Sequence, residues 1–128
     1  MEISKELLSE VLGEDVRLGV YTTVDSDEDE LVQHIMKIEI YGNRVSYWRY
    51  YKEWDDGNTM CRCSINIYEL AFKLKEWSYS KCYEIVSYTE GCEIFQTQLD
   101  EIIKYFYAET EVEAIFLACE YILNNIKH

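Results

Sequence analysis

Three stretches of the chain repeat apolar residues at helical spacing, and each begins with a residue suited to cap a helix. Ser4 precedes the first stretch, and Gly13 stands where that helix would end. Asn66 and Thr110 open the other two, each followed three residues later by a glutamate, as in a capping box. The pattern predicts three amphipathic helices. Their apolar faces would be Leu7, Leu8, Val11 and Leu12; Ile67, Leu70, Ala71, Leu74 and Trp77; and Ala114, Ile115, Ala118, Cys119, Ile122, Leu123 and Ile126.

The segments between these helices are rich in β-branched and aromatic residues, which favour strands. Gly42-Asn43 is a two-residue turn signal, and Glu90-Gly91 is a second candidate turn. Residues 99–108 fit both periods, and we favour a strand there because a helix cap follows at once at Thr110. The other strand candidates are residues 16–24, 31–41, 44–54, 83–89 and 92–98.

The order of these elements is α-βββ-α-ββ(β)-α, with short connections throughout. Runs of strands and separate helices in this order are typical of the α+β class. We therefore expect one α+β domain over residues 1–128. Its antiparallel sheet would hold about five to six strands, with the three helices packed on one face.

The composition adds a strong charge imbalance to this picture. Against 12 Lys and Arg the chain has 25 Asp and Glu, a formal net charge of -13, and it carries 12 Tyr, 3 Trp and 4 Phe. Such a charge repels phosphate backbones and anionic membranes, which require cationic surfaces. It speeds encounter with positively charged surfaces. The composition therefore predicts a basic protein partner, and no direct contact with nucleic acid or membrane.

No feature of the chain indicates export. Its beginning is charged and amphipathic, with no apolar run like that of a signal peptide, and no window approaches the length of a membrane span. The five cysteines are an odd number, which favours reduced thiols over a disulfide framework. We therefore expect a cytoplasmic protein, in the cytoplasm of the host cell if a phage encodes it.

An acidic run, residues 25–30, is the first candidate binding surface. Its opening resembles a calcium loop, but the places of the obligatory glycine and of the bidentate glutamate hold Glu30 and Met36. The run is then either a solvated loop or a contact patch for a partner rich in lysine and arginine, and both readings stay open. The candidate residues are Asp25, Asp27, Glu28, Asp29 and Glu30, with Asp55 and Asp56 as a second acidic patch.

The densest aromatic cluster, residues 47–54, is the second candidate surface. In a strand, Trp48, Tyr50 and Trp54 would lie on one face, and Tyr47, Arg49 and Tyr51 on the other. One face must pack on helices. Exposed Tyr and Arg would have the composition of interface hot spots, so Tyr47, Arg49 and Tyr51 are candidate aromatic anchors. Stacking of bases on them is disfavoured by the surrounding negative charge.

Catalytic and metal chemistry have little support in the sequence. Cys61 and Cys63 form a close thiol pair, but a structural zinc site needs four ligands and no second pair has the usual spacing. Two small thiols sharing the inner face of a strand is the simpler reading. Only two histidines are present to serve as a base, and the glycines form no phosphate loop. We expect no enzyme activity, no metal and no cofactor.

Two segments, residues 64–77 and 110–123, resemble parts of small uncharacterised proteins of bacteriophages and prophages. The likeness covers about a quarter of the chain and falls on two predicted helices. As a class, the whole chain also resembles the anti-CRISPR proteins, which are short, acidic, single-domain and free of enzyme motifs. That resemblance implies a protein that binds a CRISPR effector and occludes its nucleic-acid groove.

The leading hypothesis is a non-enzymatic inhibitor of phage or prophage origin that binds a host defence nuclease or effector. Three alternatives stay open. An immunity protein that neutralises a toxin nuclease would also be small and acidic. A module that binds a nucleotide signal would need cationic groups, for which Arg17, Arg44, Arg49 and Arg62 are the candidates. A phage structural or assembly protein would form stable homo-oligomers.

Overall fold

The computed structural model describes residues 1–25, 27–51 and 59–126, and for Asp25 only the backbone. Over these residues the chain forms three helices and nine strands, and every strand pair is antiparallel. In chain order they are α1 (Lys5–Leu12), β1 (Asp15–Val16), β2 (Gly19–Asp25), β3 (Glu30–Met36), β4 (Glu39–Tyr41), β5 (Arg44–Tyr51), β6 (Thr59–Asn66), α2 (Ile67–Ser80), β7 (Tyr83–Tyr88), β8 (Gly91–Gln96), β9 (Glu101–Tyr107) and α3 (Glu111–Ile126). The predicted α+β class is confirmed.

Hydrogen bonds to the capping side chains confirm all three predicted helix starts. Ser4 Oγ accepts a backbone N–H of the first turn of α1 at 3.1 Å, and Thr110 Oγ1 does the same for α3 at 3.1 Å. Asn66 Oδ1 accepts two backbone N–H groups of α2, at 2.9 and 3.3 Å. Gly13 ends α1 in the left-handed conformation, with φ of 65°. These starts were predictable because a cap is a contact within a few residues.

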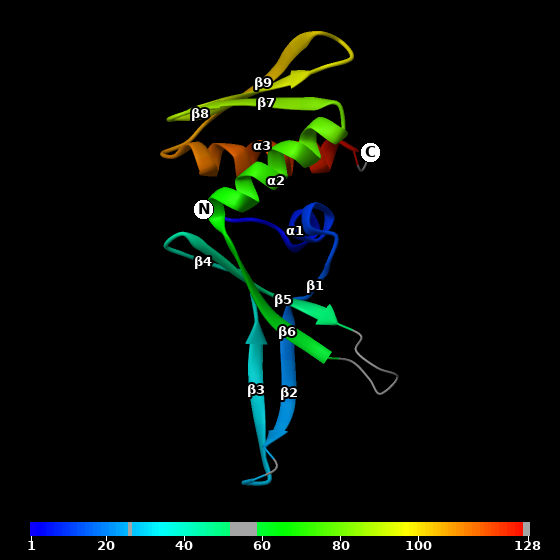
Figure 1. Ribbon diagram of the computed structural model, residues 1–128, viewed down its shortest axis with the longest axis vertical. Coiled ribbons are helices and arrows are strands. Elements are labelled where there is room, and N and C mark those ends of the chain that lie inside the picture. Colours follow the sequence, from blue (N-terminus) through cyan, green and yellow to red (C-terminus); the bar gives the residue numbers. More distant parts are fainter. Residues whose placement is uncertain (26, 52–58, 127–128) are drawn as a thin grey trace.

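The prediction of one sheet with three helices on it is wrong. The strands form a four-stranded sheet (β1, β4, β5 and β6), a separate hairpin (β2 and β3) and a three-stranded sheet (β7, β8 and β9). The element order is accordingly α-ββββββ-α-βββ-α. Helices α2 and α3 lie between the two larger sheets (Figure 1). The later strands therefore pair only with one another, because helices separate them from the first sheet.

The first sheet contains an interrupted strand. β1 and β4 lie along the same edge of β5 and run in the same direction. Val16, the last residue of β1, is opposite Arg49, and Glu39, the first residue of β4, is opposite Ser46. Only two positions of β5 stand between these partners. Strands β1 and β4 are thus two halves of one edge strand, and hairpin β2–β3 leaves the sheet between them.

The chain departs from the sheet at Arg17, whose backbone N–H donates to the carbonyl oxygen of Trp48 at 2.9 Å. Gly19, with φ of 131°, then adopts a backbone conformation that side chains rarely allow. After the hairpin the chain rejoins the edge of β5 beside Ile38, which packs against the core. This excursion explains why the predicted strands 16–24 and 31–41 are each divided in two.

Three smaller outcomes concern the strands themselves. Residues 101–107 form strand β9, which confirms the choice made for that segment. The turn between β7 and β8 lies at residues 89–90, one residue earlier than predicted. Strand β6 was missing from the predicted element order, in which only Cys61 and Cys63 were read as strand residues, because of its side chains only Ile65 is buried. The part of the predicted strand 44–54 beyond Tyr51 lies outside the described residues.

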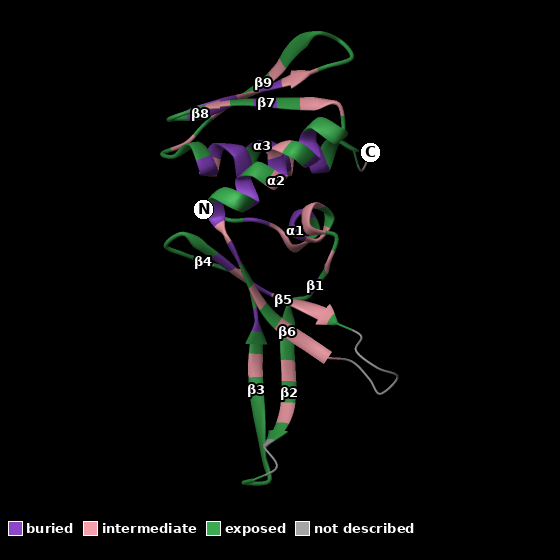
Figure 2. Ribbon diagram, in the orientation of Figure 1, coloured by how far each residue is buried: buried purple, intermediate pink, exposed green. Residues whose placement is uncertain are grey.

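One contiguous cluster of buried side chains joins the helices to both larger sheets. Its largest fully buried helical members are Phe116, Leu7, Leu8, Leu70, Leu74 and Ile122. The buried positions gather in the body formed by the helices and the facing sides of the two sheets, whereas hairpin β2–β3 projects from one end and is mostly exposed (Figure 2). No helix in the described part of the chain is long and apolar enough to cross a bilayer.

Candidate functional site

The predicted acidic run forms the tip of the projecting hairpin. Asp25 ends β2 and is paired with Glu30, which begins β3. Asp27, Glu28 and Asp29 lie in the connecting turn and are exposed, and Asp29 has a left-handed φ of 55°. Carboxylate-bearing residues are thus gathered at the point of the molecule farthest from the core (Figure 1). A tip with this geometry can enter a positively charged groove, because the hairpin holds it away from the body.

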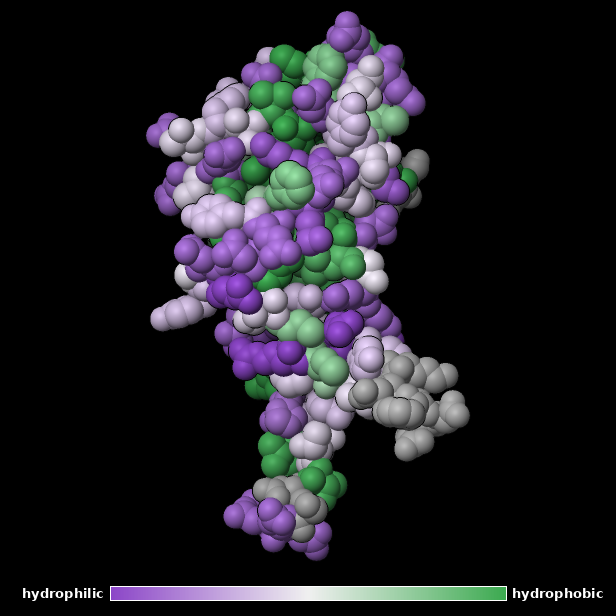
Figure 3. Space-filling view, in the orientation of Figure 1, coloured by the Kyte–Doolittle hydropathy of each residue, from purple (hydrophilic) through white to green (hydrophobic). Residues whose placement is uncertain are grey.

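One face of the same hairpin carries two exposed apolar pairs, separated by the polar pair Thr22 and Gln33. The register places Val20 opposite Ile35 and Val24 opposite Leu31, so these four side chains share a face. Each is between 61% and 73% exposed. Figure 3 shows apolar side chains on the hairpin next to the polar tip. We call Val20, Val24, Leu31 and Ile35 the hairpin stripe. Sequence reasoning missed it, because no local pattern shows which face of a hairpin stays uncovered.

The opposite face of the hairpin is attached to the body through aromatic rings. Trp48 of β5 lies 5.8 Å from His34 and 6.4 Å from Tyr21, measured between ring centroids. Tyr21 and His34 are cross-strand partners, and Thr23 lies 3.2 Å from His34 Nε2. These contacts fix the base of the hairpin. They leave the stripe and the acidic tip free of the core.

Of the three candidate aromatic anchors, Tyr47 is not exposed as the sequence interpretation required. Its side chain is only 4% exposed, and its hydroxyl donates to Glu14 Oε2 at 2.8 Å. Burial, together with that hydrogen bond, raises the pKa of the Tyr47 phenol. Tyr47 packs against the helices because its face of β5 is the inner face of the sheet. It is a core residue and cannot serve as a contact for a partner.

Arg49 and Tyr51 continue the same face of β5 towards solvent. The Arg49 guanidinium lies 3.9 Å from Glu14 Oε1 and 5.1 Å from the centre of the Tyr51 ring. Tyr51 is 38% exposed. The contacts agree with the prediction that these residues share a face with Tyr47. The side chains on that face become exposed only at the C-terminal end of β5, where Tyr51 lies. Figure 1 places that end of β5 away from the hairpin tip, so the two candidate surfaces do not merge. Asp55 and Asp56 lie outside the described residues.

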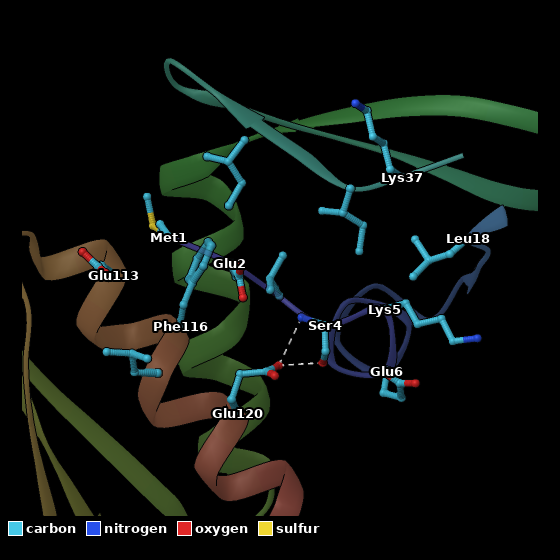
Figure 4. Close-up of a pocket in the computed structure, with 14 residues that line it drawn as sticks. Met1, Glu2, Ser4, Lys5, Glu6, Leu18, Lys37, Glu113, Phe116 and Glu120 are labelled. Atoms are coloured by element: carbon cyan, nitrogen blue, oxygen red, sulfur yellow. Dashed lines mark hydrogen bonds between the residues drawn. The ribbon is translucent and has the colours of Figure 1, made fainter. Parts of the chain in front are cut away.

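Two grooves on the body have the size of ligand sites but carry the wrong charge for a nucleotide. The larger, of about 910 Å³, lies between the N-terminal segment, α3 and β4 (Figure 4). Ser4 Oγ donates to Glu120 Oε1 across it at 2.7 Å, and Phe116 contributes to its wall. Four glutamates and two lysines line it, and the second groove, of about 640 Å³, has two glutamates and one lysine. None of the described residues around either groove is arginine.

Three of the four arginines proposed for a nucleotide contact other residues of the protein: Arg49 pairs with Glu14, and Arg17 and Arg44 make the contacts that follow. Arg17 makes two hydrogen bonds of 2.8 Å with Asp15, and Arg44 donates to Ser64 at 2.8 Å. Arg62 is exposed on β6. The structure thus gives the nucleotide-signal hypothesis no cationic pocket among its described grooves.

The thiols do not gather into a metal site in the described part of the chain, where no cluster of three or more His, Cys, Asp or Glu could hold an ion. Cys61 and Cys63 are half-buried on β6, and of the two only Cys63 packs against the core, so the simpler reading of that pair holds for Cys63. Cys92 and Cys119 are buried. Burial raises the pKa of Cys92 to about 11 and that of Cys119 further.

Comparisons with protein-family models, with curated proteins and with solved structures found no match to this chain. The surfaces described above are therefore the basis for any functional conclusion.

Proposed function

We propose that this protein is a non-enzymatic acidic inhibitor that binds a basic, nucleic-acid-handling protein through hairpin β2–β3. The acidic tip would lie against lysine and arginine residues that normally contact phosphates. The hairpin stripe would cover apolar surface beside them. Steering by the tip would supply fast association, and burial of the stripe would supply most of the affinity.

A single observation carries the proposal: the hairpin interrupts an edge strand whose two halves remain in register. An excursion that adds little to the core and exposes four aliphatic side chains is costly to solubility and folding. Such a feature is typical of a binding surface. The charge of -13 selects the kind of partner, because it repels nucleic acid and attracts basic proteins.

Within this class we infer an anti-CRISPR type of inhibitor of phage or prophage origin, acting in the host cytoplasm. The support is the class-level resemblance of the sequence together with the projecting acidic hairpin, whose shape suits the groove of an effector. A groove that accepts single-stranded or duplex nucleic acid is lined with cations. Carboxylates at the hairpin tip would replace the phosphates there and block the channel.

The test measures binding to a panel of purified CRISPR effector nucleases, each with and without guide RNA, by biolayer interferometry. We expect at least one effector to bind, and nucleic acid to compete. Reversal of the tip charges in Asp27→Lys, Glu28→Lys and Asp29→Lys together should lower the association rate about tenfold at low salt and less at high salt. Val24→Thr with Leu31→Thr should instead raise the dissociation rate, by roughly thirtyfold from the lost apolar burial.

The matched control reverses three exposed carboxylates away from the hairpin, in Glu2→Lys, Glu76→Lys and Glu109→Lys together. It changes the net charge by the same amount. If the control slows association as much as the tip variant, the hairpin is not the docking element. If no effector binds, the anti-CRISPR assignment fails, and a panel of toxin nucleases then tests the immunity-protein alternative.

A further inference from the structure

A second uncovered surface lies on the three-stranded sheet at the end of the molecule opposite the hairpin (Figure 1). Helices α2 and α3 cover one face of this sheet, where Ile85, Cys92 and Ile94 are buried. No described element covers the other face. Five of its apolar and aromatic side chains are between 42% and 76% exposed, and Phe95, which lies opposite Ile102, is half-buried. We call this surface the tyrosine face, and its members are Val86, Tyr88, Glu93, Ile102, Tyr105 and Tyr107.

The register brings these residues into adjacent rows. Val86, Glu93 and Tyr105 form one row across β7, β8 and β9, and Tyr88, Gly91 and Tyr107 form the next. Side chains in such rows are direct neighbours. The hydroxyl of Tyr88 donates to Glu93 Oε1 at 3.2 Å, which holds a carboxylate beside the tyrosine rings.

Gly91 makes this packing of rings possible. A Cβ atom on Gly91 would lie 3.3 Å from a ring carbon of Tyr88, 3.4 Å from one of Tyr107 and only 2.6 Å from the carbonyl oxygen of Phe106. The two rings therefore lean over the backbone where a side chain is missing. The rings of Tyr88 and Tyr107 thus flank the place of the missing side chain, and the carboxylate of Glu93 lies in the neighbouring row.

The protein itself shows which group such a surface binds. The guanidinium of Arg17 lies 5.1 Å from the centre of the Tyr50 ring while two hydrogen bonds hold it to Asp15. Elsewhere the guanidinium of Arg49 lies 5.1 Å from the Tyr51 ring, and Glu14 is its acidic partner. In both places a tyrosine ring, a carboxylate and an arginine occur together, because a guanidinium stacks on the ring and pairs with the acid.

The tyrosine face supplies the ring and the carboxylate but no cation, since none of its described members is lysine or arginine. We propose that it is a second docking surface, which takes an arginine-bearing segment of a protein partner. Guanidinium groups stack on Tyr105 and Tyr107 and pair with Glu93. A second copy of the chain is disfavoured, because it would bring glutamates and a further charge of -13 against the face. Nucleic acid is disfavoured for the same reason.

This surface is independent of the hairpin, and its test uses a different probe. Two synthetic peptides of equal charge, (Arg-Gly)₄ and (Lys-Gly)₄, are titrated into the ¹⁵N-labelled full chain at about 0.3 M salt, where non-specific attraction is screened. We expect the arginine peptide to bind more tightly, with amide shifts concentrated in residues 84–107. Equal binding of both peptides, or shifts spread over the whole acidic surface, would overturn the proposal.

The variants separate stacking from charge. Tyr105→Thr with Tyr107→Thr should weaken binding of the arginine peptide about five- to thirtyfold, because two stacking rings are lost. Glu93→Gln, which removes only the charge, should weaken it less but measurably. Tyr41→Thr, at a strand tyrosine exposed elsewhere, should have no effect. An equal loss in Tyr41→Thr would refute the assignment, as would full binding by the double variant or by Glu93→Gln.

The outcome is also separable from that of the proposed function. The variant with reversed charges at Asp27, Glu28 and Asp29 should keep its preference for the arginine peptide even if it no longer binds an effector. If that variant loses the preference, the arginine peptide binds the hairpin, and the tyrosine face is not a second site.

Discussion

Tyr47 and Tyr51 show how the surroundings of a side chain decide its role. The two residues lie on the same face of β5, yet Tyr47 is buried and Tyr51 is exposed. Glu14, which follows α1, approaches this face. Its carboxylate accepts a hydrogen bond from the hydroxyl of Tyr47 and forms an ion pair with the guanidinium of Arg49. Strand periodicity predicts that the two residues share a face. How far each side chain is buried depends on Glu14 and the helices, which pack on this face from distant parts of the sequence.

Tyr47→Phe should lower the free energy of unfolding by about 1 kcal/mol, because it removes one hydrogen bond to a carboxylate that water can partly reach. Urea denaturation measures the change. Tyr51→Phe is the matched control and should leave the stability unaltered. Equal effects in the two variants would contradict the structural role assigned to Tyr47.

The stability of the fold should decrease at alkaline pH. Burial raises the pKa of Cys92 to about 11, and burial also raises the pKa values of Cys119 and Tyr47. An unfolded thiol loses its proton near about pH 8.5, whereas these folded groups keep theirs, so the unfolded state binds fewer protons as pH rises. The stabilisation is complete below this pH and is lost progressively up to the folded pKa values. Urea midpoints should fall between about pH 9 and pH 11, and less steeply in Cys92→Ala.

At the scale of elements, contacts within a few residues were predictable from sequence, including the turn Gly42-Asn43 that pairs β4 with β5, whereas pairing between more distant strands was not. Each helix start follows from a capping residue within three positions of its partner, and each was found. The other pairs of the first sheet join β5 to β1 and β6, which are separated from it by more than a two-residue turn. Neither the division of this sheet from β7–β9 nor the exposure of the hairpin stripe has a local signature. The acidic tip was found because its charges are consecutive.

Asn66→Ala should lower the free energy of unfolding by about 1 kcal/mol, since the side chain satisfies two backbone N–H groups at the start of α2. Asn66→Asp keeps an oxygen acceptor and places a negative charge at the helix N-terminus, so it should retain the stability. Thermal unfolding by circular dichroism compares the two. A destabilised aspartate variant would show that the cap is not the source of the effect.

For the whole molecule, the interrupted strand makes a sharp prediction about the hairpin. Arg17 already bonds to Trp48, and Ile38 precedes Glu39, the partner of Ser46. Joining Arg17 directly to Ile38 would therefore place the two residues opposite consecutive positions of β5. The alternation would also be kept, because Ile38 and Val16 pack inward while Arg17 and Glu39 face solvent.

A chain with residues 18–37 removed should fold cooperatively and keep most of its stability. Trp48 would lose its aromatic contacts with the hairpin, so a modest decrease in melting temperature is expected. Circular dichroism and ¹⁵N correlation spectra check the fold. Binding to an effector should be lost, whereas preference for the arginine peptide should remain. An unfolded product would show that the hairpin is part of the folding unit.

The junction at Arg17 and Ile38 separates two kinds of evolutionary constraint. Under the proposed function, the sequence of the hairpin would be constrained by the partner that its tip contacts, whereas the sequence of the helices and sheets is constrained by packing. Under the proposed function, a change in the length or charge of the hairpin would alter which partner the protein binds and would leave its interior intact. The same junction is a ready place to graft foreign hairpins onto this scaffold.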